Sequence, residues 1–370
     1  MPHIDDGLDI GVLLSHRVVH APMTRCRCEM NIPTDVMKDY YSKRATRDGL
    51  IITESILISP NAGGFSNVPG LWTDKQIHSW QQITKAIHDK GGFVFGQLWH
   101  AGRASSVLPS GQTLLSSCEE PLQGTCKWTD KPFGTPKIAL HHDMDGVASD
   151  YKAAAINALQ AGFDGVELQF AYAQLPDQFL QDNINKQTKT IQERILFPLR
   201  IVDAVCGAIS SRKCAVRLSP FSTSEGAADS DPITHSEYVC TQLEKRMLAY
   251  VHLVEGRASR QQAGGSCLRP MPPSTLLPFR KVLHRTPLLG AGSYSPEKAQ
   301  AYIVDGLIDA AALGKLLLPT RIWPIEFCTI ILLGHGILKH LFQVAPKDIR
   351  ICLPTKPNLS LFTCGHSFTW

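Results

Sequence analysis

The sequence has no dense block of Lys and Arg, no secretory leader pattern and no G-x-G-x-x-G fingerprint. Lys and Arg exceed Asp and Glu by only four, 37 against 33, so we expect no nucleic-acid partner. The N-terminal segment carries two early acids and no long apolar core, which predicts a cytoplasmic protein. The G-x-G at Gly290 is too weak a signal to predict a Rossmann nicotinamide domain.

Disulfide, metal and membrane signals are also weak. Eleven cysteines are an odd number in a chain too long to need disulfide staples, so we expect free thiols. Cys26 and Cys28 lack a second Cys/His pair at ligand spacing, and "HHDMD" at 141–145 is interpreted as a polar loop, so we expect no metal. The apolar stretch 327–342 is interrupted by Gly, His and Lys and is too short to predict a membrane span.

A short apolar run, a turn and a helical pattern alternate along most of the chain, which is typical of parallel βα units. Thr73 is the expected N-cap of one helix, which presents Ile77, Trp80, Ile83 and Ile87 on one face. Ser149 is expected to open a second helix that Gly162 ends. Ser295, followed by Pro296, is expected to open a third.

Eight strand candidates follow in order: "HRVVHAP", "LIITES", "FVFGQLW", "FDGVELQ", "CAVRLSP", "AYVHLVE", "PLLGAG" and "IDAAAL". Eight strands with intervening helices over about 300 residues predict an α/β fold, a (β/α)8 TIM barrel whose active site lies at the carboxyl ends of the strands. A doubly wound sheet is the alternative. We expect one barrel domain over 1–320 and a divergent C-terminal tail over 321–370, either a packed helix or the product of an error in the gene sequence.

Several long segments resemble the old yellow enzymes, which include plant oxophytodienoate reductases. They are "HRVVHAPMTRCR", "YYSKRA", "LIITESILISPNAGGFSNVPGLW", "GGFVFGQLWHAGRAS", "AGFDGVEL", "DQFLQDNIN", "VRLSP" and "AYVHLVEGR". The resemblance implies FMN at the barrel mouth, reduced by NADPH or NADH, and a small-molecule substrate with an activated alkene. Because the nicotinamide then binds over the flavin, no Rossmann motif is needed.

Matched position by position, the resemblance assigns the cofactor contacts. Those around the flavin ring are Pro22, Met23 and Thr24 after the first strand, Ser55, Gln97 and Arg217. The Gln97 amide can donate and accept at the pyrimidine edge, and Arg217 favours the negative charge that appears on reduction. The phosphate contacts are Gly292, Ser293, Gly314 and Lys315, where lysine replaces the family's arginine and loses its bidentate geometry. Taken singly, Thr24, Gln97 and Arg217 are more often ordinary polar groups than ligands, but their joint placement at strand ends favours ligands.

The substrate-facing positions depart from the family. Gln169 and Tyr172 replace the two residues that polarise the substrate carbonyl, and Gln174 replaces the tyrosine that donates a proton. An amide has no proton to release near neutral pH, so Gln174 cannot act as a general acid. Trp72 stands where relatives often place a pocket tyrosine, and "INKQTKTIQER" lacks the family's "YGGS" turn.

Three hypotheses follow from this pattern. The first is an FMN-dependent NAD(P)H oxidoreductase that reduces an enone-type alkene, in secondary metabolism. The second is a flavin-dependent isomerase or an impaired flavin-binding relative, because loss of the proton donor suppresses net reduction more than electron transfer. The third is a non-catalytic scaffold, against which the cofactor contacts argue.

Overall fold

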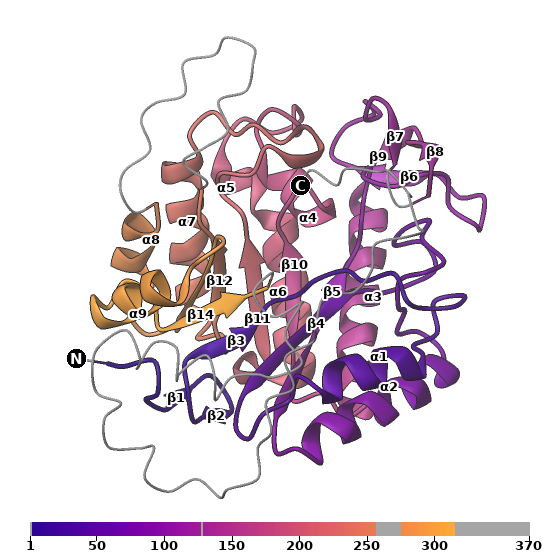
Figure 1. Ribbon diagram of the computed structural model, residues 1–370. Helices are drawn as coiled ribbons and strands as arrows, with labels where there is room; N and C mark the ends of the chain where they lie inside the picture. The colour runs from indigo at the N-terminus through magenta and orange to yellow at the C-terminus, as the bar shows by residue number, and fades with distance from the viewer. Residues whose placement is uncertain (1, 127–128, 257–274, 315–370) are drawn as a thin grey trace, which may run out of the picture. The chain divides into compact units, whose positions relative to one another are not determined.

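The computed structural model describes residues 2–126, 129–256 and 275–314 (Figure 1). Within them, eight strands pair in parallel, each with two neighbours, and close into a barrel. In barrel order they are β3 (Val18–His20), β4 (Leu50–Leu57), β5 (Phe93–Trp99), β10 (Gly165–Phe170), β11 (Cys214–Leu218), β12 (Val251–Val254), β13 (Leu288–Ala291) and β14 (Ala310–Leu313). All eight predicted strands are confirmed, and a closed barrel excludes the doubly wound sheet.

Alternating residues of these strands fill the barrel interior. Leu50 and Ile52 of β4 belong to one buried cluster with Ala310 and Ala312 of β14, while the residues between them face the helices. An N-terminal hairpin of β1 (Leu8–Asp9) and β2 (Leu13–Leu14) adds further apolar side chains at the amino ends of the strands, namely Ile10 and Leu14. Each fully buried Leu or Ile contributes about 1.5–3 kcal/mol. The amino end of the barrel is therefore a closed core.

Helices surround the barrel strands (Figure 1). The longer ones are α1 (Asp35–Ser42), α2 (Asp74–His88), α3 (His141–Gln160), α6 (Leu196–Ile209), α7 (Pro232–Glu244) and α9 (Pro296–Val304). The shorter ones are α4 (Leu175–Leu180), α5 (Ile191–Arg194) and α8 (Leu277–Val282), with 3-10 turns at Ser211–Lys213 and Ser224–Gly226.

Two of the three predicted helix starts are confirmed. Thr73 Oγ1 accepts a hydrogen bond from Gln76 N at 3.3 Å, and the Gln76 side chain accepts one from Thr73 N at 3.0 Å, which is a complete capping box. Ser295 caps α9 by accepting from Lys298 N at 3.2 Å, with proline at the first helical position. Sequence rules for caps work here because donor and acceptor lie within three residues of each other.

The predicted start of α3 is wrong. The helix begins at His141 and not at Ser149, so "HHDMD" forms its first turns and is not a loop. The Asp143 carboxylate accepts from Leu140 N at 3.0 Å, which caps the helix from inside its first turn. The buried face then continues through Val147 and Tyr151. A leucine at the N-cap position gave no signal of this start.

Four short strands after β5 were not predicted. They are β6 (Leu114–Ser116), β7 (Thr125–Cys126), β8 (Lys131–Pro132) and β9 (Pro136–Ile138). β6 pairs with β9, β7 pairs with β8, and β6 contacts α4. Strands of two or three residues are too short to show an apolar period.

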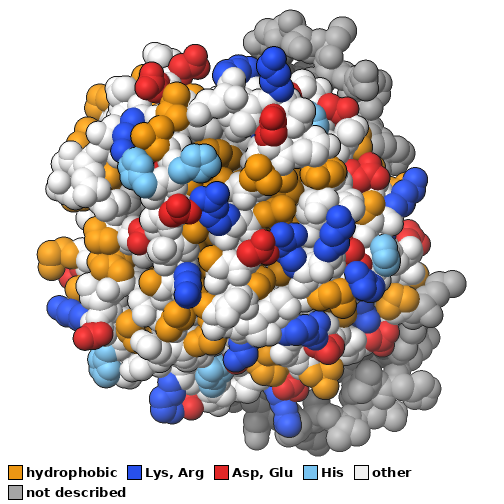
Figure 2. Space-filling view, turned by 180° about the vertical axis from the view of Figure 1, so that it is seen from behind, with side chains coloured by type: hydrophobic (Ala, Val, Ile, Leu, Met, Phe, Trp, Pro, Cys, Tyr) orange, Lys and Arg blue, Asp and Glu red, His pale blue; other side chains and the backbone are white. Residues whose placement is uncertain are grey.

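The described part of the chain lies within the first of two compact units, residues 1–329. The second unit, residues 330–370, lies outside the described residues, as do the predicted tail and the apolar stretch 327–342. No helix among residues 2–126, 129–256 and 275–314 is long and apolar enough to cross a membrane. The cysteines in these ranges are free thiols, as expected. Basic and acidic side chains are interspersed on the face shown in Figure 2.

Candidate active site at the carboxyl ends of the barrel strands

A layer of polar side chains lies directly above the apolar floor of the barrel. Phe95, Ala215 and Tyr250 belong to the buried apolar cluster. Two residues further along the same strands, toward their carboxyl ends, the period of two places polar side chains on the same inner face. Together with two residues of β10, they form what we call the polar layer: Gln97, Glu167, Gln169, Arg217 and His252. The register of the strands places these residues at similar heights along the barrel axis, because Glu167 is opposite Gln97, and Arg217 is opposite both Gln169 and His252.

Buried hydrogen bonds join the polar layer. Gln97 Nε2 donates to Glu167 Oε1 at 2.7 Å, and His252 Nδ1 donates to Glu167 Oε2 at 2.9 Å. Ser55 Oγ donates to Gln97 Oε1 at 2.6 Å from β4, where the ladder with β5 shifts register between Ile52 and Ser55. The two oxygens of Glu167 thus tie β5 and β12 to β10.

The charges in the layer are compensated. Burial raises the pKa of Glu167, but His252, Arg217 and the bond from Gln97 outweigh burial and leave that pKa below its ordinary value. Burial lowers the pKa of His252, more than Glu167 raises it. Glu167 is therefore an anion and His252 a neutral imidazole at neutral pH, with Arg217 as the cation that balances Glu167.

Three buried atoms in this layer have no partner among the residues that the structure describes. They are His252 Nε2, in a fully buried side chain, and Arg217 Nε and Gln169 Oε1, in side chains that are 8 % and 6 % exposed. A buried polar atom without a hydrogen bond costs about 1–3 kcal/mol, so such atoms point to a ligand. A polar heterocycle on which negative charge can develop fits Arg217, and Gln169 Oε1 can accept from a second ligand beside it. FMN carries such a heterocycle.

The loops after β13 and β14 fit the phosphate end of the same cofactor. Gly292 has a φ of +153°, and a Cβ there would lie 2.9 Å from the Glu255 Cβ, so only glycine fits. Ser293 follows with a φ of +64°, and consecutive amides in such a turn can form an anion-binding concavity. A Cβ on Gly314 would lie 3.1 Å from Met23 Sδ, which places the end of β14 against the segment after β3. Lys315 lies outside the described residues.

Pro22, Met23 and Thr24 follow β3 at the same end of the barrel. Pro22 is buried, and Met23 and Thr24 are half-buried. Arg25 N, the next amide, donates to the Glu54 carboxylate at 3.0 Å, which ties this segment to β4. The predicted cofactor contacts within the described ranges therefore all lie at or just after the carboxyl ends of the barrel strands.

The segment directly after β10, residues 171–174, has an unusual backbone, and we call it the β10 turn. Tyr172 and Ala173 have φ values of +61° and +54°, a region that costs a non-glycine residue about 1 kcal/mol or more. Two bonds to their amides stabilise it: Tyr172 N donates to Ser219 Oγ, and Ala173 N donates to Asp177 Oδ2, both at 2.7 Å. The backbone is thus fixed independently of the side chains at these positions.

The side chains of the β10 turn point in different directions. Gln174 Oε1 accepts from Trp99 Nε1 at 2.5 Å, and Gln174 Nε2 donates to Tyr172 O at 3.0 Å. Both ends of this amide are therefore occupied by the protein. The Tyr172 ring instead lies against the Arg217 guanidinium, whose Cζ is 5.3 Å from the centroid of the ring. Tyr172, and not Gln174, faces the polar layer.

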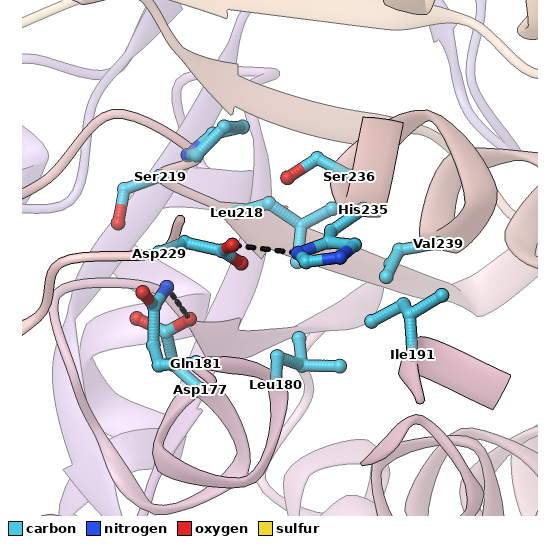
Figure 3. A pocket seen from close by; sticks show the side chains of 11 residues that line it. Asp177, Leu180, Gln181, Ile191, Leu218, Ser219, Asp229, His235, Ser236 and Val239 are labelled. Atoms are coloured by element: carbon cyan, nitrogen blue, oxygen red, sulfur yellow. Dashed lines mark hydrogen bonds and ion pairs between the residues drawn. The ribbon is translucent and has the colours of Figure 1, made fainter. Parts of the chain in front are cut away.

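Behind the β10 turn lies a small cavity, shown in Figure 3. Ser219 and Asp177, which bind the two amides of the turn, line it, and Gln181 Nε2 donates to Asp177 Oδ1 at 3.0 Å. Burial raises the pKa of Asp177 to about 7. The cavity is therefore part of the support of the turn.

An acidic cluster borders the same cavity. Asp182, Asp229 and His235 are close enough together to hold a metal ion. However, His235 Nδ1 already lies 2.6 Å from Asp229 Oδ1, and Arg194 Nη2 lies 3.2 Å and 3.3 Å from the two ring nitrogens. Asp182 accepts from Ser230 N at 3.1 Å. Arg194 supplies the positive charge here, so we assign no metal.

Trp72 lies just before α2, with its ring against Gly70 and its amide donating to Gln76 Oε1 at 2.8 Å. These contacts do not join it to the polar layer, and its place in the substrate pocket stays a prediction. Glu167 and His252 were missed. The signal that could have found them is a charged and a titratable residue inside strands that are otherwise apolar, because such groups are buried only with partners.

Comparison with known proteins agrees with this fold. Residues 8–319 match the model of the NADH:flavin oxidoreductase / NADH oxidase family. The chain is 37% identical over 326 residues to 12-oxophytodienoate reductase 1 of Oryza sativa subsp. japonica, covering 85% of this chain and 82% of that protein. Among solved structures it resembles morphinone reductase, with 33% identity, a TM-score of 0.80 and coverage of 89% and 90% of the two chains. It also resembles the old yellow enzyme homologue from Zymomonas mobilis, with 30% identity, a TM-score of 0.82 and coverage of 89% and 93%. Morphinone reductase is also known in complex with tetrahydroNAD.

Proposed function

Because the chain belongs to the NADH:flavin oxidoreductase / NADH oxidase family, and within it to the old yellow enzymes, we propose that it reduces the activated double bond of an enone-type small molecule. FMN, when bound, takes electrons from the nicotinamide and passes them to the substrate. The chain's own residues bind and orient the two partners and supply the proton.

On the cofactor side, the unpartnered Arg217 Nε and the buried amide of Gln97 support binding of the flavin's pyrimidine edge. Arg217 stabilises negative charge that develops there, which is worth about 3–4 kcal/mol for a preorganised group of this kind. Gly292, Ser293 and Gly314 hold the phosphate, and we propose that Lys315 adds its charge.

On the substrate side, one observation carries the proposal: Tyr172 lies over Arg217, while Gln174 is bonded at each end of its amide, to Trp99 and to Tyr172 O. We propose that Tyr172 takes over the role of the missing tyrosine. Its hydroxyl donates a hydrogen bond to the substrate and then a proton to the α-carbon, and solvent reprotonates it. Gln169, whose Oε1 has no partner within the described ranges, orients the substrate's polar group through its amide.

An isomerase is the second candidate, because the Gln174 amide has no proton to release. If no proton reaches the substrate carbon, the hydride returns from the carbon that received it after rotation about the former double bond, so the alkene changes its geometry and is not reduced. The two candidates differ in one observable, the net consumption of nicotinamide for each product formed.

The test is an anaerobic stopped-flow experiment in two halves. NADPH or NADH should bleach the bound FMN, and an enone such as cyclohexenone should restore the colour. Tyr172→Phe should slow the second half about 100-fold and leave the first unchanged. Tyr238→Phe removes a phenol from α7 and is the matched control, with no effect on either half.

Three outcomes contradict parts of this proposal. Failure to bind FMN rules out both enzyme candidates, and bleaching with no enone-driven return rules out the reductase. Product formed without net nicotinamide consumption supports the isomerase. Because three polar positions that usually serve many enones are replaced, we further propose one dedicated substrate in secondary metabolism; equal rates across a panel of unrelated enones would contradict this.

A further inference from the structure

Gln97 is bonded at both ends of its amide, and the bonds specify which end is which. Glu167 is an anion, and a carboxylate can only accept, so the group that faces it must be the Gln97 NH2. The carbonyl oxygen must then face Ser55, whose hydroxyl donates to it at 2.6 Å. In the flipped orientation the carbonyl oxygen would face the Glu167 carboxylate, so the Glu167 bond would be lost, while Ser55 would have to accept and not donate. All three side chains are at least nine-tenths buried, so water does not relax this choice.

The clamped amide keeps half of its capacity. It has two N–H donors and two carbonyl lone pairs, and one of each is used by Glu167 and Ser55. One donor and one acceptor remain, in a fixed order, for a ligand above the layer. A pyrimidine edge presents acceptors and a donor in a fixed order as well, so an amide free to flip would match it only part of the time.

We propose that Glu167 and Ser55 are positioning residues that fix the orientation of the Gln97 amide toward the flavin, Glu167 through its charge and Ser55 through its hydroxyl. The inference rests on the proposed cofactor contacts of Gln97. His252 belongs to the same device, because its Nδ1–H occupies the second Glu167 oxygen and keeps the carboxylate from rotating away. Glu167 also offsets the charge of Arg217, so its loss favours the reduced, more negative flavin.

The experiment compares three variants of the full chain reconstituted with FMN. Glu167→Gln keeps the shape but can donate as well as accept, so the Gln97 amide can flip. Ser55→Ala removes one bond and leaves the orientation set by Glu167. Thr84→Val removes a buried hydroxyl, one that donates to Ala161 O at 2.7 Å outside the barrel, and is the matched control.

We expect the dissociation constant of oxidised FMN, measured by flavin fluorescence, to rise about tenfold in E167Q, about threefold in S55A and not at all in T84V. In E167Q the midpoint potential should also rise, because the ratio of the affinities for reduced and oxidised FMN increases about tenfold, or about 30 mV for a two-electron couple. Thermal unfolding of the apo proteins reports purely structural damage, which T84V should share.

The proposal is overturned if E167Q and S55A change FMN affinity no more than T84V, or if the potential of E167Q is unchanged or falls. Should E167Q fail to fold, S55A against T84V decides the clamp by the same criterion. Failure of the wild-type chain to bind FMN is a different result, and it removes the cofactor assignment itself.

Discussion

The polar layer and the β10 turn lie side by side at the barrel mouth but are stabilised in different ways. In the polar layer the bonds run between side chains, as from Gln97 and His252 to Glu167. In the β10 turn the supporting bonds run to backbone amides, from Tyr172 N and Ala173 N to Ser219 and Asp177. A bond to an amide is available to any residue except proline, so side chains of the turn can be exchanged without loss of its backbone.

This difference accounts for the predicted departures from the family. A substitution among the hydrogen-bonded members of the polar layer leaves a buried partner unpaired, at a cost of about 1–3 kcal/mol or more. Gln169, the substituted position in the layer, has an Oε1 without a partner within the described ranges. Tyr172 and Gln174 sit in a backbone that Asp177 and Ser219 hold for them. Substrate handling can therefore diverge while the cofactor contacts stay fixed.

Removing the charge of Arg217, the cation of the polar layer, should have the largest effect on the rate of the reaction. Arg217→Met keeps the length of the side chain and removes the charge, which leaves Glu167 buried without compensation. Flavin reduction by the nicotinamide should slow about 100- to 1000-fold, as for the loss of a preorganised charge. Stopped-flow reduction of the reconstituted protein measures this.

Arg217→Lys is the control, because it restores the charge without the planar geometry. It should recover part of the rate. Wild-type reduction in R217M would mean that the polar layer does not face the flavin, and the contrast between the two regions would then have no functional meaning.

Restoring the family's phenol should have the next largest effect, and on the other half-reaction. Gln174→Tyr, alone or with Gln169→His and Tyr172→His, places a general acid at the family position. Reoxidation of the flavin by an enone should become about tenfold faster, less than the full contribution of a general acid because Tyr172 already supplies part of it. Flavin reduction should not change. An unchanged reoxidation rate in every combination would show that the substituted positions do not limit the reaction.

Removing the support of the turn should affect stability and substrate binding together. Asp177→Asn leaves one oxygen to accept where two bonds are needed, from Ala173 N and Gln181 Nε2. We expect a loss of about 1–3 kcal/mol in unfolding free energy and a rise of several-fold in the enone KM, with flavin reduction unaffected. Ser219→Ala, which loses the companion bond to Tyr172 N, should behave in the same way.

The loss in D177N should depend on pH. Burial raises the pKa of Asp177 to about 7 in the folded protein, so the folded state binds this proton more tightly than the unfolded state does. The stability that this bound proton adds is present at pH 4 and is lost as pH rises toward 7. The difference in unfolding free energy between wild type and D177N should therefore become smaller over that range. Glu54, whose pKa burial also raises to about 7, is present in both proteins and cancels in the difference. A gap that widens with pH would contradict the assignment.

The two regions also differ in how much the sequence foretells. Strand positions were predictable because runs such as Phe93–Trp99 are mostly apolar over several consecutive residues, a local property. The turn's substitutions were visible by resemblance, since Gln174 occupies a recognisable position. The bonds of the polar layer were not predictable, because Gln97 and Glu167 are 70 residues apart and Glu167 and His252 are 85 apart. Closure of the barrel brings them together, and no local pattern encodes that pairing.

The smallest effect is expected from removing the hydrogen bond that Trp99 donates to the Gln174 side chain. Trp99→Phe removes the indole N–H that binds Gln174 Oε1 and keeps an aromatic ring against Phe65, now stacked at 5.1 Å and 19°. Gln174 is half-buried, so water can replace the lost bond to its amide. We therefore expect the free energy of unfolding to fall by only about 1 kcal/mol. The enone KM should change two- to threefold, and the rate of flavin reduction should stay the same. Phe65→Leu weakens the same stack but leaves the Gln174 bond, so it should lower the melting temperature without the change in KM. If both variants alter KM equally, packing of Trp99 and not its bond to Gln174 shapes the substrate side, and the independence of the turn's side chains from its backbone would need a different explanation.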